Sequence, residues 1–249
     1  MTRFNYENQE YLNKLEKLSA SYYAKYISTI SKFLPDKNGL FLEVGCGNGL
    51  VLSILKKKGY TKCYGVDISK LFIHEAKQKK IPHVYSYDGV SLPFKDGYFD
   101  LISSFNVLEH TEDPSRYLKE QIKKVKKEGI IIVGCPNFLS IFSFGNHPQL
   151  KGFFRKVINT ITVFKKLTEN RNGTFHKMEP IIRTPFQYDD DAIVVTNLID
   201  LKSFFKKNKC EVLYETGFLH YDAKIYNLIN SIPFFRYLMP SCFIIVQKK

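Results

Sequence analysis

Three glycines at alternate positions, Gly45, Gly47 and Gly49, form the stretch of this chain whose residue types and spacing most clearly suggest chemistry. They follow an apolar segment that carries one acid, Glu43, and a run with helical spacing comes next. Glycine allows the backbone to turn with positive φ and lets another molecule approach it closely. A buried strand that ends in such a turn opens the ligand crevice of doubly wound α/β sheets. We therefore expect a cofactor site at this turn.

The spacing of the glycines indicates which cofactor binds. A dinucleotide fingerprint has glycines at positions one, three and six, whereas this turn has them at one, three and five and has Leu50 as its sixth residue. The carboxylate of Glu43 would also face a pyrophosphate unfavourably. A cofactor with a cationic amine or sulfonium tolerates that carboxylate better, so an NAD(P)-dependent oxidoreductase is the less favoured alternative.

Two aspartates follow the next two predicted strands. Asp67 ends a strand over residues 63–67, where a carboxylate can accept both hydroxyls of a ribose. Asp88 and Gly89 end a short strand over residues 84–89. Because the carboxyl ends of parallel strands meet at one edge of a sheet, we expect both acids to face the same crevice as the glycine turn.

These motifs resemble those of the class I S-adenosylmethionine-dependent methyltransferases. Residues 43–49 are similar to motif I, Asp67 to motif II, and residues 105–110 to the segment of the small-molecule branch in which Leu-Glu-His lies under the methionine part of the cofactor. The resemblance implies S-adenosylmethionine as cofactor and S-adenosylhomocysteine as product, with Ile68 against the adenine and Asp88 accepting its amino group. The cofactor-binding residues that it implies are Glu43, Gly45, Cys46, Gly47, Asn48, Gly49, Asp67, Ile68, Asp88, Gly89, Asn106, Val107, Leu108 and His110.

Candidates for catalysis are fewer. His110 is the natural general base or substrate orienter, because imidazole titrates near neutral pH. The competing interpretation is that His110 helps to start the next helix and shapes the cleft. His176 and Tyr188 are the further catalytic candidates, and His147 and Asp190 are other polar residues to consider. We expect no metal site, since the spacing of the histidines and acids is irregular.

The elements that must position these residues alternate between strands and helices. The predicted strands cover residues 40–44, 63–67, 84–89, 98–104, 129–135, 210–214 and 242–246. The main predicted helices cover 69–80, 113–127, 197–209 and, within residues 222–238, the part before Pro233. This order predicts a doubly wound, seven-stranded, mostly parallel α/β sheet, the Rossmann-like methyltransferase fold, with an antiparallel last strand and an inserted lid.

The chain is predicted to form a single methyltransferase domain over residues 1–249. The family resemblance implies that residues 1–38 form an N-terminal helical cap over the cofactor cleft. Tyr11, Tyr22 or Tyr23 could then line the cleft, although simple packing on the core is the favoured role for each. Residues 138–196 form an aromatic and basic insertion without a clear βα repeat. It follows the fifth strand, at the edge where ligands bind, and is therefore the best candidate for a substrate lid.

The composition limits which partners the protein could bind and in which cellular compartment we expect it. The net charge is +13, but the 37 basic residues are mostly lysines on predicted helices, which favours solvated outer faces over nucleic-acid recognition. Attraction to anionic substrates or membrane surfaces stays open. Five scattered cysteines indicate reduced thiols, no apolar run approaches the roughly 20 residues of a membrane span, and a secretory segment is lacking, so we expect a cytoplasmic protein.

The resemblance predicts methyl transfer to an oxygen or nitrogen of a small molecule or glycoconjugate. Residues 186–193 are loosely similar to methyltransferases of bacterial surface-polysaccharide synthesis, whereas the aromatic insertion also suits a lipid or quinone-like acceptor or a peripheral membrane contact. A non-catalytic protein that binds the cofactor is the alternative from another class. The oligomeric state is not determined by the sequence.

Overall fold

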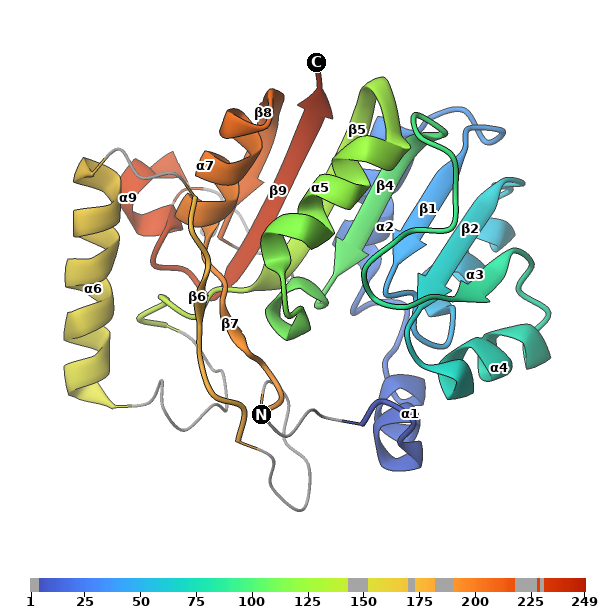
Figure 1. Cartoon of the computed structure of the whole chain (residues 1–249), viewed down its shortest axis with the longest axis horizontal. Coiled ribbons are helices and arrows are strands. Elements are labelled where there is room, and N and C mark those ends of the chain that lie inside the picture. Colours follow the sequence, from blue (N-terminus) through green and yellow to red (C-terminus); the bar gives the residue numbers. More distant parts are fainter. Residues whose placement is uncertain (1–4, 143–151, 170–172, 182–189, 218–227, 229–230) are drawn as a thin grey trace.

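The computed structural model describes residues 5–142, 152–169, 173–181, 190–217, 228 and 231–249. Within these residues, a seven-stranded sheet has the strand order β3-β2-β1-β4-β5-β9-β8 (Figure 1). Its strands are β1 (Phe41–Val44), β2 (Cys63–Asp67), β3 (Val84–Ser86), β4 (Phe99–Phe105), β5 (Val125–Pro136), β8 (Cys210–Thr216) and β9 (Ser241–Lys248). A separate two-stranded ladder joins β6 (His176–Lys177) to β7 (Val194–Val195).

The direction of the strands matches the predicted fold. Strand β1 pairs in parallel with both β2 and β4, and β4 pairs in parallel with β5. The last strand, β9, lies between β5 and β8 and is antiparallel to both. The prediction of a mostly parallel sheet with an antiparallel last strand is thus confirmed.

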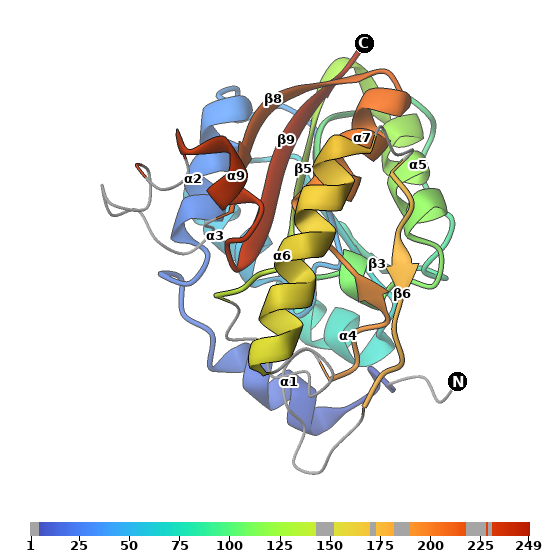
Figure 2. The same ribbon diagram turned by 90° about the vertical axis from the view of Figure 1, so that its left-hand side faces the viewer.

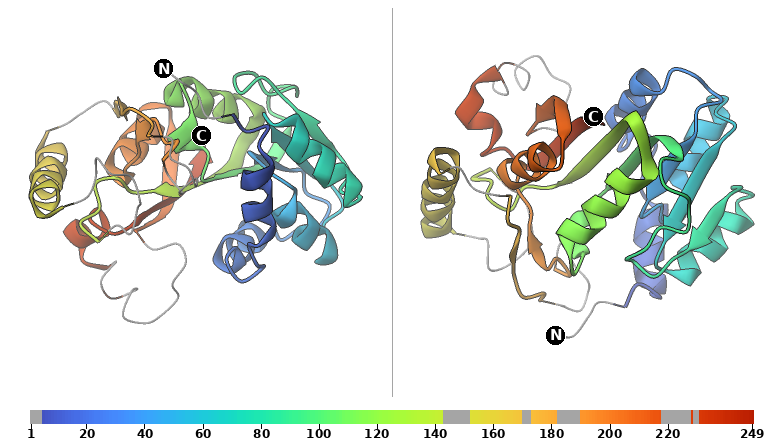
Figure 3. Two further views of the ribbon diagram at one scale, coloured as in Figure 1. Left: turned by 90° about the horizontal axis from the view of Figure 1, so that it is seen from below. Right: turned by 45° about the horizontal axis from the view of Figure 1, so that its top comes forward.

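Helices cover both faces of the sheet. The helices are α1 (Gln9–Glu16), α2 (Ala24–Phe33), α3 (Leu50–Lys57), α4 (Lys70–Gln78), the 3₁₀ turn η1 (Leu108–His110), α5 (Pro114–Lys124), α6 (Phe153–Thr168), α7 (Leu198–Lys207) and the single turn α9 (Pro233–Arg236). Helices α5 and α7 lie on one face and α2 and α3 on the other (Figures 1 and 3).

Two apolar cores follow from this layering. Successive side chains of a strand point to opposite faces, so a central parallel strand must be apolar at every position. In β5, Ile131 and Val133 pack into the core under α5 and α7, whereas Ile130 and Ile132 pack into the core under α2 and α3. This double burial holds the carboxyl ends of the strands rigidly in place.

Three predicted elements need correction. Helix α5 ends at Lys124 rather than near residue 127, because Val125 is already extended and pairs with Phe99 of β4. The third strand ends at Ser86, so Asp88 lies in the turn that follows it. Helix α9 begins at Pro233, where the predicted helix was expected to end, since proline suits the first position of a helix. Residues 218–227 and 229–230 of that prediction lie outside the described residues.

The insertion contains a helix that the sequence analysis missed. Helix α6 spans 16 residues between Gly152 and Glu169. Its signal is present in the sequence as Phe154, Ile158 and Ile161, which recur at helical intervals.

Candidate cofactor and active site

The glycine turn closes the carboxyl end of β1 and starts α3. Gly45, Gly47 and Gly49 have φ values of 78°, 52° and 76°, all in the left-handed region that side chains disfavour. The turn packs tightly against the segment after β4, because a Cβ on Gly45 would collide with Val107 of that segment. The backbone N–H groups of Gly45 and Cys46 donate to the carbonyl of Val66 in β2. The turn is therefore a close-packed cradle of backbone between two strand ends.

Glu43 is buried beneath this cradle, and its environment fits a cationic ligand. It is 4% exposed, and its Oε2 has no hydrogen-bond partner within the described part of the chain. Burial, and secondly the charge of Asp67, raises the pKa of Glu43 well above its usual range. A buried carboxyl oxygen without a partner is costly unless a ligand satisfies it. The site thus fits a cofactor that carries an ammonium and a sulfonium.

Asp67 ends β2 directly beside the glycine turn. Its Oδ2 accepts a hydrogen bond of 2.8 Å from the backbone N–H of Gly47, and its Oδ1 accepts one of 3.0 Å from Ser69. Burial raises the pKa of Asp67 to about 6, although these backbone donors oppose the shift. The two hydrogen bonds fix the carboxylate at the mouth of the turn. The Asp67 carboxylate keeps acceptor capacity for the ribose hydroxyls that the resemblance implies.

The predicted adenine contacts lie side by side. Ile68 is 45% exposed, which is unusual for an isoleucine at the end of a buried strand. A Cβ on Gly89 would come within 3.3 Å of Ile68, so the two residues form one small apolar wall. Asp88 is exposed, and its Oδ1 accepts from the backbone N–H groups of Val90 and Ser91. Asp88 thus caps its own turn.

Helix α1 covers the glycine turn from the carboxyl edge of the sheet (Figure 1). Leu15 lies about as close to Gly47 as van der Waals contact allows, 3.4 Å from the position of a Cβ there. Tyr11 stacks on Phe72 of α4 with ring centroids 5.7 Å apart. Burial, then the charge of Asp191, raises the pKa of Tyr11 well above its usual range. The role of residues 1–38 as a cap stays a prediction, which this arrangement supports.

The segment after β4 brings His110 to the same edge. Asn106 has a positive φ of 52°, which turns the chain out of β4, and Leu108 is fully buried. Nδ1 of His110 then lies 3.2 Å from Oδ2 of Asp191, and its Nε2 lies 3.7 Å from Oε1 of Glu109. The His110 side chain is 14% exposed, so it is reachable from the cleft while Asp191 is not.

Asp191 is a site residue that the sequence analysis missed. It precedes β7 and is held by the hydroxyl of Tyr6, which donates a hydrogen bond of 2.6 Å to Oδ2. The backbone N–H of Ile193 donates to the carbonyl of Glu109, which ties this segment to η1. Asp190 had been singled out instead, and it is fully buried. A run of three aspartates contains no local signal for which one meets a histidine.

Of the two other catalytic candidates, His176 and Tyr188, the structure describes only His176. His176 lies exposed in β6, where it pairs with Val195 of β7. Tyr188 and His147 lie outside the described residues.

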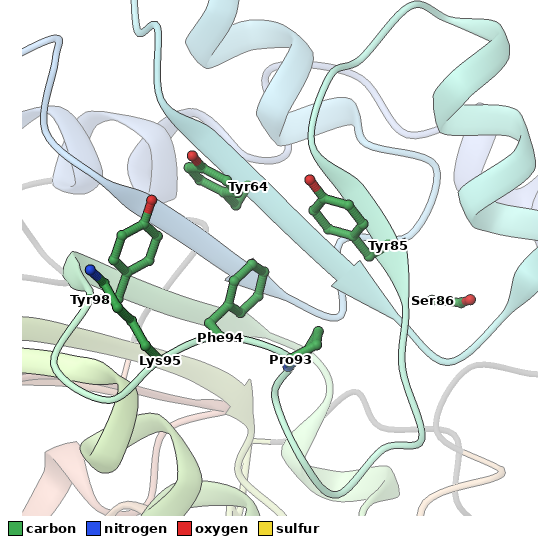
Figure 4. A pocket seen from close by; sticks show the side chains of 7 residues that line it. All are labelled: Tyr64, Tyr85, Ser86, Pro93, Phe94, Lys95 and Tyr98. Atoms are coloured by element: carbon green, nitrogen blue, oxygen red, sulfur yellow. The ribbon is translucent and has the colours of Figure 1, made fainter.

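A surface depression lined by aromatic side chains lies over β2 and β3 (Figure 4). The described residues that line it are Tyr64, Tyr85, Ser86, Pro93, Phe94, Lys95 and Tyr98, none of them a predicted site residue.

Comparison with known proteins agrees with this geometry. The profile of a family described as "Methyltransferase domain" matches residues 42–133, which contain the glycine turn, Asp67 and His110. An uncharacterized protein of Methanocaldococcus jannaschii is 32% identical over 219 residues, which cover 84% of this chain and 78% of that protein. The chain belongs to the class I S-adenosylmethionine-dependent methyltransferases. Its cofactor is S-adenosylmethionine.

This methyltransferase is also similar to a named enzyme and to a solved structure. The ubiquinone biosynthesis O-methyltransferase of Pelagibacter ubique is 31% identical over 107 residues, or 41% of this chain and 44% of that protein. The chain thus spans less than half of that characterised relative. A methyltransferase structure from Mesorhizobium loti shares the fold with a TM-score of 0.61 at 12% identity, covering 89% of this chain and 96% of that one.

Proposed function

We propose that this methyltransferase transfers the methyl group to a hydroxyl oxygen of a small molecule, with His110 as the general base. The observation that carries the proposal is the contact between Nδ1 of His110 and Oδ2 of Asp191 at the mouth of the cofactor cradle. A carboxylate in this position orients an imidazole and stabilises its protonated form.

The residues of the cradle would hold the cofactor in place. Asp67 would accept the ribose hydroxyls, Ile68 and Gly89 would contact the adenine, and Glu43 would face the positive charge. When bound, the cofactor supplies an electrophilic methyl carbon on a sulfonium, whose C–S electron pair remains on sulfur as the new O–C bond forms. The chain mainly contributes position, which can be worth several kcal/mol of barrier when the reacting atoms are held in line.

The hydroxyl proton needs a destination, and the cluster provides one. A proton on Nδ1 of His110 would be shared with Asp191, which leaves Nε2 as the basic nitrogen. Burial, and secondly Asp191, raises the pKa of Tyr6 well above its usual range, so Tyr6 stays protonated and keeps donating to Asp191. An amine that arrives neutral needs no base. A carboxylate-supported imidazole therefore favours oxygen over nitrogen as the acceptor atom.

For the methyl acceptor we propose only a chemical class. The similarity to a ubiquinone biosynthesis O-methyltransferase supports a phenolic hydroxyl, such as that of a quinol-like ring. A glycoconjugate acceptor in surface-polysaccharide synthesis stays an untested prediction. All five cysteines are free and buried, which supports the predicted reducing compartment.

The proposal is tested by release of S-adenosylhomocysteine with three probes, a catechol, a methyl glycoside and a primary alkylamine. We expect turnover with a hydroxyl probe, reduced about 100-fold in His110→Gln, while calorimetry shows that the variant still binds S-adenosylmethionine. Turnover with the amine alone, unchanged in His110→Gln, would show that His110 is not a base and that nitrogen is the acceptor.

A further inference from the structure

Helix α6 presents an apolar face to the outside of the molecule. It stands at one end of the domain, beyond β8, and crosses the front of the view in Figure 2. Its buried residues are Asn159, Val163 and Lys166, two of which are polar. The exposed apolar residues of the helix are Phe153 (76%), Phe154 (82%), Val157 (43%), Ile158 (50%), Ile161 (61%), Phe164 (62%) and Leu167 (41%). Surface helices of soluble domains show the opposite arrangement.

Polar anchors on the buried side hold the helix in this orientation. Nζ of Lys166 lies 2.8 Å from each carboxylate oxygen of Asp200 in α7, and both side chains are almost fully buried. Asn197 donates a further hydrogen bond of 2.6 Å to the same carboxylate, and Asn159 donates to the carbonyl of Phe138. Turning α6 to bury its phenylalanines would leave a charged pair uncompensated. The outward apolar face is thus a fixed feature of the fold.

The charges on α6 favour an anionic surface as the occupant. The helix carries Arg155, Lys156, Lys165 and Lys166 and has no acidic residue between Phe153 and Thr168. The charge of Lys166 is neutralised by Asp200, and Lys165 lies 3.8 Å from Glu169 just beyond the helix. An apolar helix face with basic residues beside it is the pattern of helices that lie in the headgroup region of a bilayer. The net charge of +13 acts in the same direction.

A single exposed helix suits a bilayer as its partner, because each inserted apolar side chain lowers the free energy of binding on its own.

We infer that α6 is a membrane-docking element, which lies in the interface of an anionic bilayer with Phe154, Ile161 and Phe164 directed toward the acyl chains. Among the described residues, none of the helices could span a bilayer. This inference does not depend on the acceptor proposed above. It concerns where the enzyme works rather than what it methylates.

The sequence offers a direct reporter for this contact, since the chain has no tryptophan. Phe154→Trp places a single indole on the outer face of α6. Tyr85→Trp is the matched control, because Tyr85 is 41% exposed on β3 at the other edge of the sheet. With vesicles of phosphatidylcholine and phosphatidylglycerol, we expect a blue-shifted emission and quenching by brominated acyl chains for Phe154→Trp only. An equal response of both reporters would overturn the inference, because charge alone would then explain binding.

A second pair of variants tests the apolar face itself. Ile161→Ser should weaken binding to these vesicles by about tenfold or more, whereas Tyr85→Ser should bind as the wild type does. Neither side chain is in the buried core, so thermal unfolding of both should stay close to that of the wild type. Unchanged vesicle binding in Ile161→Ser would refute membrane docking. So would a wild-type dimer that ignores vesicles and that Ile161→Ser dissociates, since that result would assign the face to a second copy.

Discussion

The Nδ1 atom of His110 lies 3.2 Å from Oδ2 of Asp191, although one residue belongs to η1 and the other to the segment before β7. The hydroxyl of Tyr6 donates to the same carboxylate oxygen from the N-terminal segment. Three distant parts of the chain therefore meet at one carboxylate. This convergence is the geometric basis for proposing His110 as the general base.

Asp191→Asn should lower kcat about 10- to 100-fold, because the amide neither stabilises the imidazolium nor fixes the tautomer of His110. The acidic limb of the pH–rate profile tests this role. It should move to lower pH, because the imidazole becomes a weaker base, only if His110 acts as that base. Tyr6→Phe removes only the donor to Asp191 and should cost about fivefold or less, in keeping with one hydrogen bond. Equal losses in the two variants, with unchanged pH profiles, would indicate a merely structural cluster.

Asp67 should make both stability and cofactor binding depend on pH. Its pKa rises from 3.8 in the unfolded chain to about 6 in the folded state, so the folded state binds more protons between these values. The free energy of unfolding should therefore fall as pH rises from about 4 to about 6, by about 3 kcal/mol at most from this group. Denaturant titrations at several pH values should show this slope in the wild type and not in Asp67→Asn.

Protonation of Asp67 should also change the affinity for the cofactor, but here low pH should weaken binding rather than stabilise the fold. Ribose hydroxyls need the carboxylate as acceptor, so S-adenosylmethionine should bind more weakly as pH falls below about 6. Asp67→Asn should bind about tenfold more weakly at neutral pH and should lose this dependence. A variant that binds as tightly as the wild type in calorimetry would remove Asp67 from the ribose site.

Gly45→Ala should destabilise the domain and abolish measurable cofactor binding. The added Cβ would sit at a positive φ of 78° and collide with Val107. Gly97→Ala is the matched control, since Gly97 also has a positive φ, of 60°, but has open space where the Cβ would lie. We expect about 1–2 kcal/mol for the control from backbone strain and clearly more for Gly45→Ala. Equal losses of unfolding free energy would mean that strain alone, and not the close approach of Val107, requires the glycine.

Lys166→Met should cost about 3–5 kcal/mol, because it leaves the buried carboxylate of Asp200 without its partner. The double variant Lys166→Met/Asp200→Leu should recover part of that loss, since it removes both buried charges and leaves only the Asn197 amide without this acceptor. Equilibrium unfolding of the two variants measures the difference. Additive losses in the double variant would show that the ion pair is not the anchor of α6.

Much of the cofactor-binding part of the fold could be predicted from the sequence, because the sequence signals for it are local. The strand before Gly45, the turn and the start of α3 are contiguous in sequence, and their apolar period and glycine spacing depend only on backbone sterics and burial. The same is true of Asp67, which is placed by the end of its own strand. Even the antiparallel last strand follows from the order of elements in a shared fold.

The contact between His110 and Asp191 and the orientation of α6 were decided by tertiary structure alone. Nothing in the run of aspartates says that Asp191 rather than Asp190 faces His110, because that choice depends on how the segment before β7 pairs with η1. The period of α6 shows that the helix is amphipathic, but Lys166 and Asp200 decide which face is buried. Leaving a buried charge without its partner costs more free energy than exposing the apolar residues of one helix. The apolar face of α6 therefore points outward.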